Sequence, residues 1–162
     1  MATAFAPGKC ILFGEHAVVY GHPAVAVAID AGVEVKLETS DKWEIKNDHY
    51  SNNFEEFQAS KNPHIQHIIR NVFDYNGPPL KIKIESNLFS SAGLGSSAAL
   101  SNAMGAALHQ LINPEDEINQ IKLAKIGHSA EASAQEGRAS PTDSATSSLG
   151  GCIVVSTIFC VM

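Results

Sequence analysis

A glycine- and serine-rich segment in the middle of the chain, SSAGLGSSAAL (residues 90–100), is the first candidate for chemistry. Gly93 and Gly95 leave backbone amides accessible, and the small apolar residues that follow predict a helix whose free N–H groups point back into the segment. Such a loop can bind phosphate, and the hydroxyls of Ser96 and Ser97 could bond a phosphate oxygen or complete a Mg²⁺ shell. Small residues that only permit close helix packing remain the alternative on this segment alone.

Two better-known phosphate-binding loops do not fit this segment. No lysine follows Gly95, so the GxxxxGK[ST] loop is absent. The spacing Gly93-x-Gly95-x-x-Ala98 does match a loose dinucleotide-binding fingerprint. A Rossmann unit, however, returns to a parallel strand after its helix, whereas a second helix is predicted here.

A second polar group surrounds a short apolar run near the N-terminus. Lys9 precedes the run, and Glu15 and His16 follow it directly. Polar residues at both ends of a buried strand often face one cleft, so these three side chains could hold a small acid that carries hydroxyls. Taken singly, a solvated lysine, a helix-capping glutamate and a partly buried histidine are the ordinary alternatives.

A third segment, ASPTDSATSSLGG (residues 139–151), surrounds one carboxylate, Asp143, with small hydroxyl residues. It is interpreted as a loop before the final strand that could present a catalytic aspartate; a turn that caps a helix is the alternative. Glu131, on the preceding predicted helix, could join Ser97 in holding a metal, or could be a solvated acid. The remaining histidines show no zinc-ligand spacing with cysteine, and no GxSxG segment is present.

The elements that must position these residues follow from periodicity. Alternating patterns predict strands at 33–39 and 80–86, short apolar runs predict strands buried on both faces at 10–13 and 24–29, and a further strand is expected at 43–46. Helices are predicted from Pro63 to about Asn76, from Leu94 to Leu111, and from an N-cap at Asn113 to about Gln135, with residues 47–62 as a loop. Strands in the first half and helices in the second indicate an α+β fold.

Composition narrows the classes of partner. The 162 residues are 44% hydrophobic, which is enough for one domain with a sizeable core. The formal net charge is −6 and the basic residues are scattered, which argues against nucleic-acid or anionic-membrane partners. The three cysteines form no CxxC pair, and neither a signal segment nor a membrane-spanning run is evident, so a cytoplasmic location is expected.

Three ordered segments, PGKCILFGEHAVVYGHPA, SSAGLGSSAA and ASPTDSATSSLGG, together resemble the GHMP superfamily of small-molecule kinases. The similarity covers almost the whole chain. It implies an α+β domain of the ribosomal protein S5 domain 2-like type, which is the N-terminal lobe of such a kinase and spans residues 1–162. The family is about twice this length, so the resemblance implies that the C-terminal lobe is not part of these residues. We expect the chain to end within or just after a core strand, and to show weak or absent activity.

The resemblance also implies a reaction and its participants. Within the superfamily, GEHAVVYG and SPTDS imply the ATP-dependent phosphorylation of mevalonate to 5-phosphomevalonate, a step in isoprenoid precursor synthesis, with Mg²⁺ as the metal. Another hydroxyl substrate (phosphomevalonate, homoserine or a sugar) and a non-catalytic nucleotide-binding lobe are the alternatives. A homodimer is left open.

The resemblance implies a role for each candidate residue. Asp143 would be the catalytic base and Lys9 would neutralise charge near the transferred phosphoryl group. Ser97 and Glu131 would hold Mg²⁺. The phosphates of ATP would lie against Gly93, Leu94, Gly95, Ser96, Ser97 and Ala98, and mevalonate would contact Glu15, His16 and Thr142. The chain departs from the family pattern in having Phe89 where a proline is usual, and in one extra residue between Glu131 and Asp143, which makes Glu136 a rival metal ligand.

Overall fold

The computed structural model describes residues 1–15, 20–47, 50–54, 62–89, 92–137 and 139–156. Within these ranges the strands are β1 (Ala2–Phe13), β2 (Ala24–Thr39), β3 (Trp43–Asn47), β4 (Tyr50–Phe54), β5 (Leu80–Ser86) and β6 (Cys152–Val155). The helices are α1 (Pro63–Gln66), which continues into a π-helical turn η3 (His67–Val72), α2 (Ser96–Ile112), α3 (Gln120–Ala134) and α4 (Pro141–Leu149). The α+β class predicted from the sequence is confirmed.

The described strands form one mixed sheet in the order β1-β2-β5-β3-β4, with β6 pairing β2 as well. Every pairing is antiparallel except that between β3 and β5. The two runs predicted separately at 24–29 and 33–39 fuse into the long strand β2. One end of β2 pairs with β6 and the other with β5, so β2 connects the two halves of the sheet.

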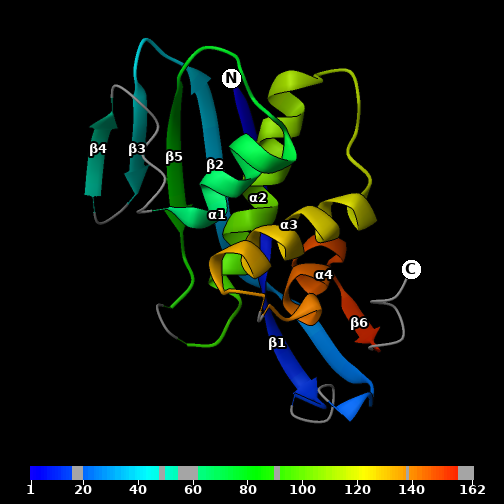
Figure 1. Ribbon diagram of the computed structural model, residues 1–162. Coiled ribbons are helices and arrows are strands. Elements are labelled where there is room, and N and C mark those ends of the chain that lie inside the picture. Colours follow the sequence, from blue (N-terminus) through cyan, green and yellow to red (C-terminus); the bar gives the residue numbers. More distant parts are fainter. Residues whose placement is uncertain (16–19, 48–49, 55–61, 90–91, 138, 157–162) are drawn as a thin grey trace.

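The helices cover one face of the sheet (Figure 1). Alternation along β2 and β5 explains why: Val35, Leu37 and Ile82 are fully buried beneath the helices, whereas Lys36 and Glu85 on the other face form an ion pair. The core between sheet and helices is completed by aliphatic side chains from β3, α1, η3 and α2, namely Ile45, Ile65, Ile68, Ile69, Met104 and Leu108. No helix among the described residues is long and apolar enough to cross a bilayer.

Because helices cover only one face of the sheet, one prediction about strand burial is wrong. The strands at 10–13 and 24–29 were expected to be buried on both faces. In the structure Leu12 and Phe13 are 48% and 73% exposed, and within residues 24–29 only Ala24 and Ala26 are fully buried. A sheet with helices on one side leaves its other face to solvent, whatever the local hydrophobicity of the strand.

The third helix begins later than predicted. Its N-cap is Asn119, whose side chain accepts hydrogen bonds from the amides of Ile121 and Lys122. Asn113, predicted as this N-cap, is instead the C-cap of α2. Asn113 precedes Pro114, and a residue before proline is disfavoured in helical conformation, so α2 ends there and a separate connection leads to α3.

Two predicted loops contain regular structure. Residues 50–54 of the predicted loop 47–62 form β4, which pairs with β3. Most of the predicted loop 139–151 forms the helix α4, with Ser140 at its N-cap and Pro141 in its first turn. The segment is therefore helical rather than a loop, although the Ser140 side chain makes no capping hydrogen bond, and the catalytic role of Asp143 stays a prediction. Serine and threonine have low helix propensity, and tertiary packing overrides it here.

Candidate active site

Lys9 and Asp143 lie side by side although they come from opposite ends of the chain. Lys9 Nζ is 3.3 Å from Asp143 Oδ1, and only 8% of the lysine side chain and 22% of the aspartate side chain are exposed. Lys9 belongs to β1, where Thr3 and Phe5 point away from the helices; strict alternation would send Lys9 the same way. The pairing of β1 with β2 shifts register between Pro7 and Lys9, and this irregularity turns Lys9 toward the helices.

The glycine segment packs directly on the strand that carries Lys9. The backbone N–H of Lys9 donates to Leu94 O at 2.8 Å. Gly8 permits this approach, because a Cβ at that position would lie 2.8 Å from Leu94 O. Gly95 has a φ of +72°, and a Cβ there would meet Lys9 Cγ at 2.9 Å and Asp143 Oδ2 at 3.8 Å. Gly95 therefore brings the backbone of the loop against both side chains.

The same loop opens the long helix α2. Gly95 is the N-cap of α2 and supplies no capping side chain, and the amide of Ala99 makes the first helical bond, to Gly95 O. By helix geometry the amides of Ser96, Ser97 and Ala98 have no partner within the helix. These amides and the positive end of the helix dipole form an anion-binding arrangement next to Lys9.

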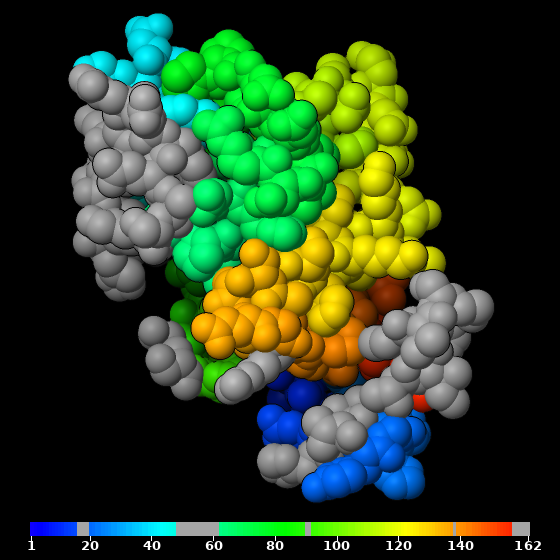
Figure 2. All heavy atoms as spheres, in the orientation of Figure 1, coloured from blue at the N-terminus to red at the C-terminus, as the bar shows by residue number. Residues whose placement is uncertain are grey.

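Asp143 is held in the first turn of α4 by a buried contact with α2. Asn102 Nδ2 donates to the backbone carbonyl of Ser144 at 2.9 Å. On the other side Asn102 lies against Gly127 of α3, where a Cβ would come within 2.1 Å of Asn102 Oδ1. Three helices are thus locked together one residue from Asp143. In the space-filling view the end of α3 and the start of α4, in orange, lie beside the blue N-terminal strands (Figure 2).

The surroundings of Asp143 raise the pKa of its carboxyl above the ordinary aspartate value. Burial is the largest effect and raises the pKa of the Asp143 carboxyl; the charge and hydrogen bond of Lys9 oppose this, while the carboxylates of Glu131 and Glu15 raise the pKa further. Asp143 is therefore a stronger proton acceptor than an exposed aspartate. The interaction also places Glu131 and Glu15 within electrostatic reach of Asp143.

Glu131 approaches the site from α3 and is 3% exposed. Gly105 of α2 lies against Leu123 and Ile126, and Gly127 lies against Asn102, so α3 runs antiparallel to α2. The residues that follow Gly127 consequently approach the first turn of α2, which carries Ser97. Glu136, the rival metal ligand, is exposed and lies beyond the end of α3 with a φ of +54°.

The Glu131 carboxylate suits a cation. Its Oε1 atom is buried and accepts no hydrogen bond, while Oε2 accepts one from Gln135 Nε2 at 3.4 Å. In the described part of the chain no group of three or more His, Cys, Asp or Glu side chains could hold a metal by itself. Mg²⁺ is commonly held by one or two carboxylates together with substrate phosphates, so Glu131 near the phosphate-binding helix end fits that ion.

The remaining predicted site residues are distributed less tightly. Glu15 is exposed just beyond β1, and His16 lies outside the described residues. Thr142 is buried, and its hydroxyl makes no hydrogen bond. Sequence reasoning did not identify Gly8, Asn102 or Gly127, because a glycine or an asparagine inside a regular element carries no signal of the partner it will meet.

Two hollows in the surface are lined by other residues. One, of about 460 Å³, lies at the end of α2 distant from the glycine loop and includes Phe73, Tyr75 and Leu111. The other is an apolar groove of about 520 Å³ between α3, α4 and β6, lined by Ile121, Leu149 and Val154 among others. Neither is lined by Lys9, Asp143 or the described residues of the glycine loop.

Comparison with known proteins identifies the family to which this chain belongs. Residues 63–151 match the model described as GHMP kinases N terminal domain. The chain is 35% identical to the mevalonate kinase of Saccharolobus solfataricus, over 94% of its own length and 51% of that protein. A crystal structure of the Methanococcus jannaschii mevalonate kinase superposes with a TM-score of 0.83 at 30% identity, covering 95% of this chain and 53% of that one.

A galactokinase structure from Lactococcus lactis shares the fold at 19% identity and a TM-score of 0.71, covering 88% of this chain and 40% of that one. Kinases named for different substrates therefore share this architecture. The chain belongs to the GHMP kinases and matches their N-terminal domain. It spans about half the length of the curated mevalonate kinases that it matches.

Proposed function

We propose that residues 1–162 form the ATP- and substrate-binding domain of a kinase that transfers the γ-phosphoryl group of ATP to the primary hydroxyl of mevalonate. The observation that carries this proposal is the position of the Lys9–Asp143 pair, 3.3 Å apart, against the glycine at the N-terminus of α2. A proton acceptor, a cation and a phosphate-binding helix end thus meet at one place. Phosphoryl transfer requires mainly positioning and charge neutralisation, which this arrangement can supply.

In the proposed reaction the amides of residues 93–98 bind the phosphates of ATP. The Asp143 carboxylate accepts the proton of the substrate hydroxyl while the hydroxyl oxygen forms a bond to the γ-phosphorus of ATP. The bond between the γ-phosphorus and the β–γ bridging oxygen breaks, and ADP leaves. Lys9 stabilises the negative charge on the oxygens around that phosphorus. Ser97 and Glu131 would hold Mg²⁺, which supplies further neutralisation of the phosphate oxygens when bound.

The fold does not determine the substrate, because sugar kinases have the same fold. Mevalonate is favoured because the curated relatives that cover most of this chain are mevalonate kinases. Glu15, His16 and Thr142 are proposed to contact mevalonate. The cytoplasmic location expected from composition belongs to the same proposal.

A phosphoryl-transfer assay tests the proposal. The chain is incubated with Mg²⁺, γ-³²P-labelled ATP and one candidate substrate at a time, namely mevalonate, phosphomevalonate, homoserine or galactose; the label allows slow turnover to be detected. We expect labelled 5-phosphomevalonate, with formation abolished in Asp143→Asn. Asp116→Asn, an exposed acid at the opposite end of α2, is the matched control. Nucleotide binding without labelled product from any substrate would instead support a non-catalytic lobe.

A further inference from the structure

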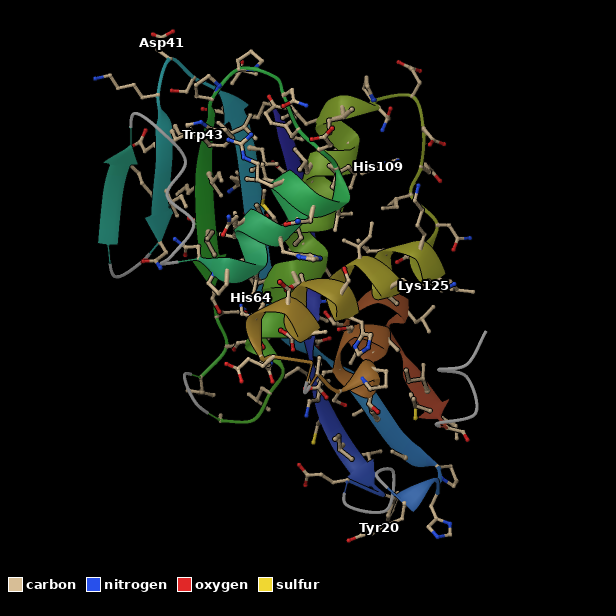
Figure 3. All side chains as sticks on the ribbon, viewed as in Figure 1. Tyr20, Asp41, Trp43, His64, His109 and Lys125 are labelled. Atoms are coloured by element: carbon tan, nitrogen blue, oxygen red, sulfur yellow. The ribbon has the colours of Figure 1, made fainter. Side chains whose placement is uncertain are left out.

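His64 and Glu131 face each other across the contact between α1 and α3. His64 Nε2 lies 3.3 Å from Glu131 Oε1, with side-chain exposures of 20% and 4%. Both atoms are buried, and neither makes a hydrogen bond. Figure 3 shows His64 on α1, beside α3. The glutamate proposed to hold the metal therefore has a nitrogen donor within reach on the side of its carboxylate that Gln135 does not occupy.

A buried carboxylate oxygen without a hydrogen-bond partner destabilises the folded protein, and more so when the group is charged. The arrangement becomes favourable if the His64 ring turns its Nε2–H toward Oε1, which needs little change in the existing separation. Each carboxylate oxygen can accept more than one contact, so an oxygen that accepts from His64 or Gln135 still has a lone pair for a cation.

His64 is also placed rigidly enough to orient another side chain. It is the second residue of α1, directly after Pro63, and the helix is anchored by Ile65, Ile68 and Ile69, which are fully buried in the core. A donor on a fixed short helix limits the rotation of the glutamate that it contacts. Outer contacts of this kind commonly determine how well a carboxylate ligand binds its metal.

We propose that His64 is a positioning residue that donates its Nε2–H to Glu131 Oε1 and, together with Gln135, orients the Glu131 carboxylate toward the divalent cation of the ATP complex. This inference rests on the proposed function, because it assigns Glu131 to the metal. It adds α1, which carries none of the motifs singled out in the sequence, to the elements that shape the site.

The test measures metal binding separately from catalysis. Mn²⁺ replaces Mg²⁺, and the affinity of the chain for Mn²⁺ with a non-hydrolysable ATP analogue is measured from the electron paramagnetic resonance signal of free Mn²⁺. His64→Leu removes the donor, whereas His64→Gln retains an N–H at a similar distance from the backbone. His109→Leu is the matched control, because His109 also pairs with an acid, Asp116 at 3.5 Å, but at the far end of α2. Thermal unfolding of every variant is recorded.

We expect His64→Leu to weaken Mn²⁺ binding about 10-fold or more. His64→Gln should stay within a few-fold of the wild-type affinity, and His109→Leu should leave it unchanged whatever it does to thermal stability. Equal Mn²⁺ affinity in wild type and His64→Leu overturns the positioning role, as does a His64→Gln variant as weak as His64→Leu. Absence of nucleotide-dependent Mn²⁺ binding in the wild-type chain overturns the proposed function as well, so the two failures are distinguishable.

Discussion

Lys9 Nζ lies 3.3 Å from Asp143 Oδ1, and this contact joins the first strand of the chain to its last helix. Two unrelated local features create it. A register shift in β1 turns Lys9 toward the helices, and the bond from Asn102 to Ser144 holds the turn of α4 that bears Asp143. The glycine loop then packs against both side chains, so the candidate proton acceptor lies next to the candidate phosphate-binding amides.

Replacing Asp143 by asparagine should abolish phosphoryl transfer while nucleotide binding persists. Asparagine preserves the shape of the side chain but cannot accept the hydroxyl proton, and loss of a general base commonly costs about 100- to 10,000-fold in rate. Product formation and affinity for an ATP analogue are measured on the same preparation. Undiminished turnover in Asp143→Asn would show that another group accepts the proton.

The same substitution should raise thermal stability at neutral pH. The pKa of Asp143 is raised in the folded protein, chiefly by burial, so the folded state binds this proton more tightly than the unfolded state does. The contribution of Asp143 to the free energy of unfolding therefore falls as the pH rises from the ordinary aspartate pKa through the raised pKa of the folded protein. Asp143→Asn mimics the protonated form, so its melting temperature should exceed that of wild type at pH 7 and converge with it near pH 3.8. A lower melting temperature at pH 7 would contradict this reasoning.

Gly95→Ala and Gly93→Ala should separate backbone strain from steric contact. Both glycines have positive φ, +72° and +69°, where a side chain costs about 1–2 kcal/mol. At Gly95 the new Cβ would also meet Lys9 Cγ at 2.9 Å, whereas at Gly93 it would meet nothing within 4 Å. Gly95→Ala should therefore weaken binding of an ATP analogue more than Gly93→Ala does. Equal losses in calorimetric affinity would indicate that strain alone matters.

Asn102 and Gly127 should behave as a coupled pair. In Gly127→Ala the added Cβ would lie 2.1 Å from Asn102 Oδ1, so overpacking should cost about 1–3 kcal/mol of unfolding free energy. Asn102→Ala removes that obstacle but also the bond to Ser144. The double variant should consequently lose less stability than the sum of the single variants, measured by urea denaturation. Strict additivity would mean that the two residues do not contact each other.

The outer face of the sheet should contribute to acid sensitivity. Hydrogen bonds from Lys83 and Lys36 lower the pKa of Glu85 to about 2. A lowered carboxyl pKa stabilises the folded state above the unfolded value of 4.5, and this contribution is lost as pH falls through about 2. Glu85→Gln should lower the melting temperature slightly at pH 7 and low salt, less at high salt, and not at pH 2. A difference that is independent of pH would exclude the ion-pair explanation.

Strands were predicted well where one face is buried and the other wet. Residues 33–39 and 80–86 alternate strictly, and both lie in strands of the sheet because that pattern matches a sheet covered by helices on one side. The helix α4 was missed because its serines and threonines favour turns in isolation, and its helical form depends on packing against α3, α2 and β1. The N-cap of α3 was placed at Asn113 because Asn113-Pro114 has the pattern of a helix start, whereas the actual N-cap, Asn119, lies six residues later and has no proline after it.

The sequence by itself determined the three ordered motifs, the α+β class and, through their resemblance, the kinase family, because these depend on residue types and local spacing. Tertiary structure alone decided that Lys9 meets Asp143, that Asn102 fits against Gly127, and that His64 faces Glu131. Those contacts join residues far apart in the chain. They depend on a strand irregularity and on the packing of helices against one another, for which no local pattern carries information.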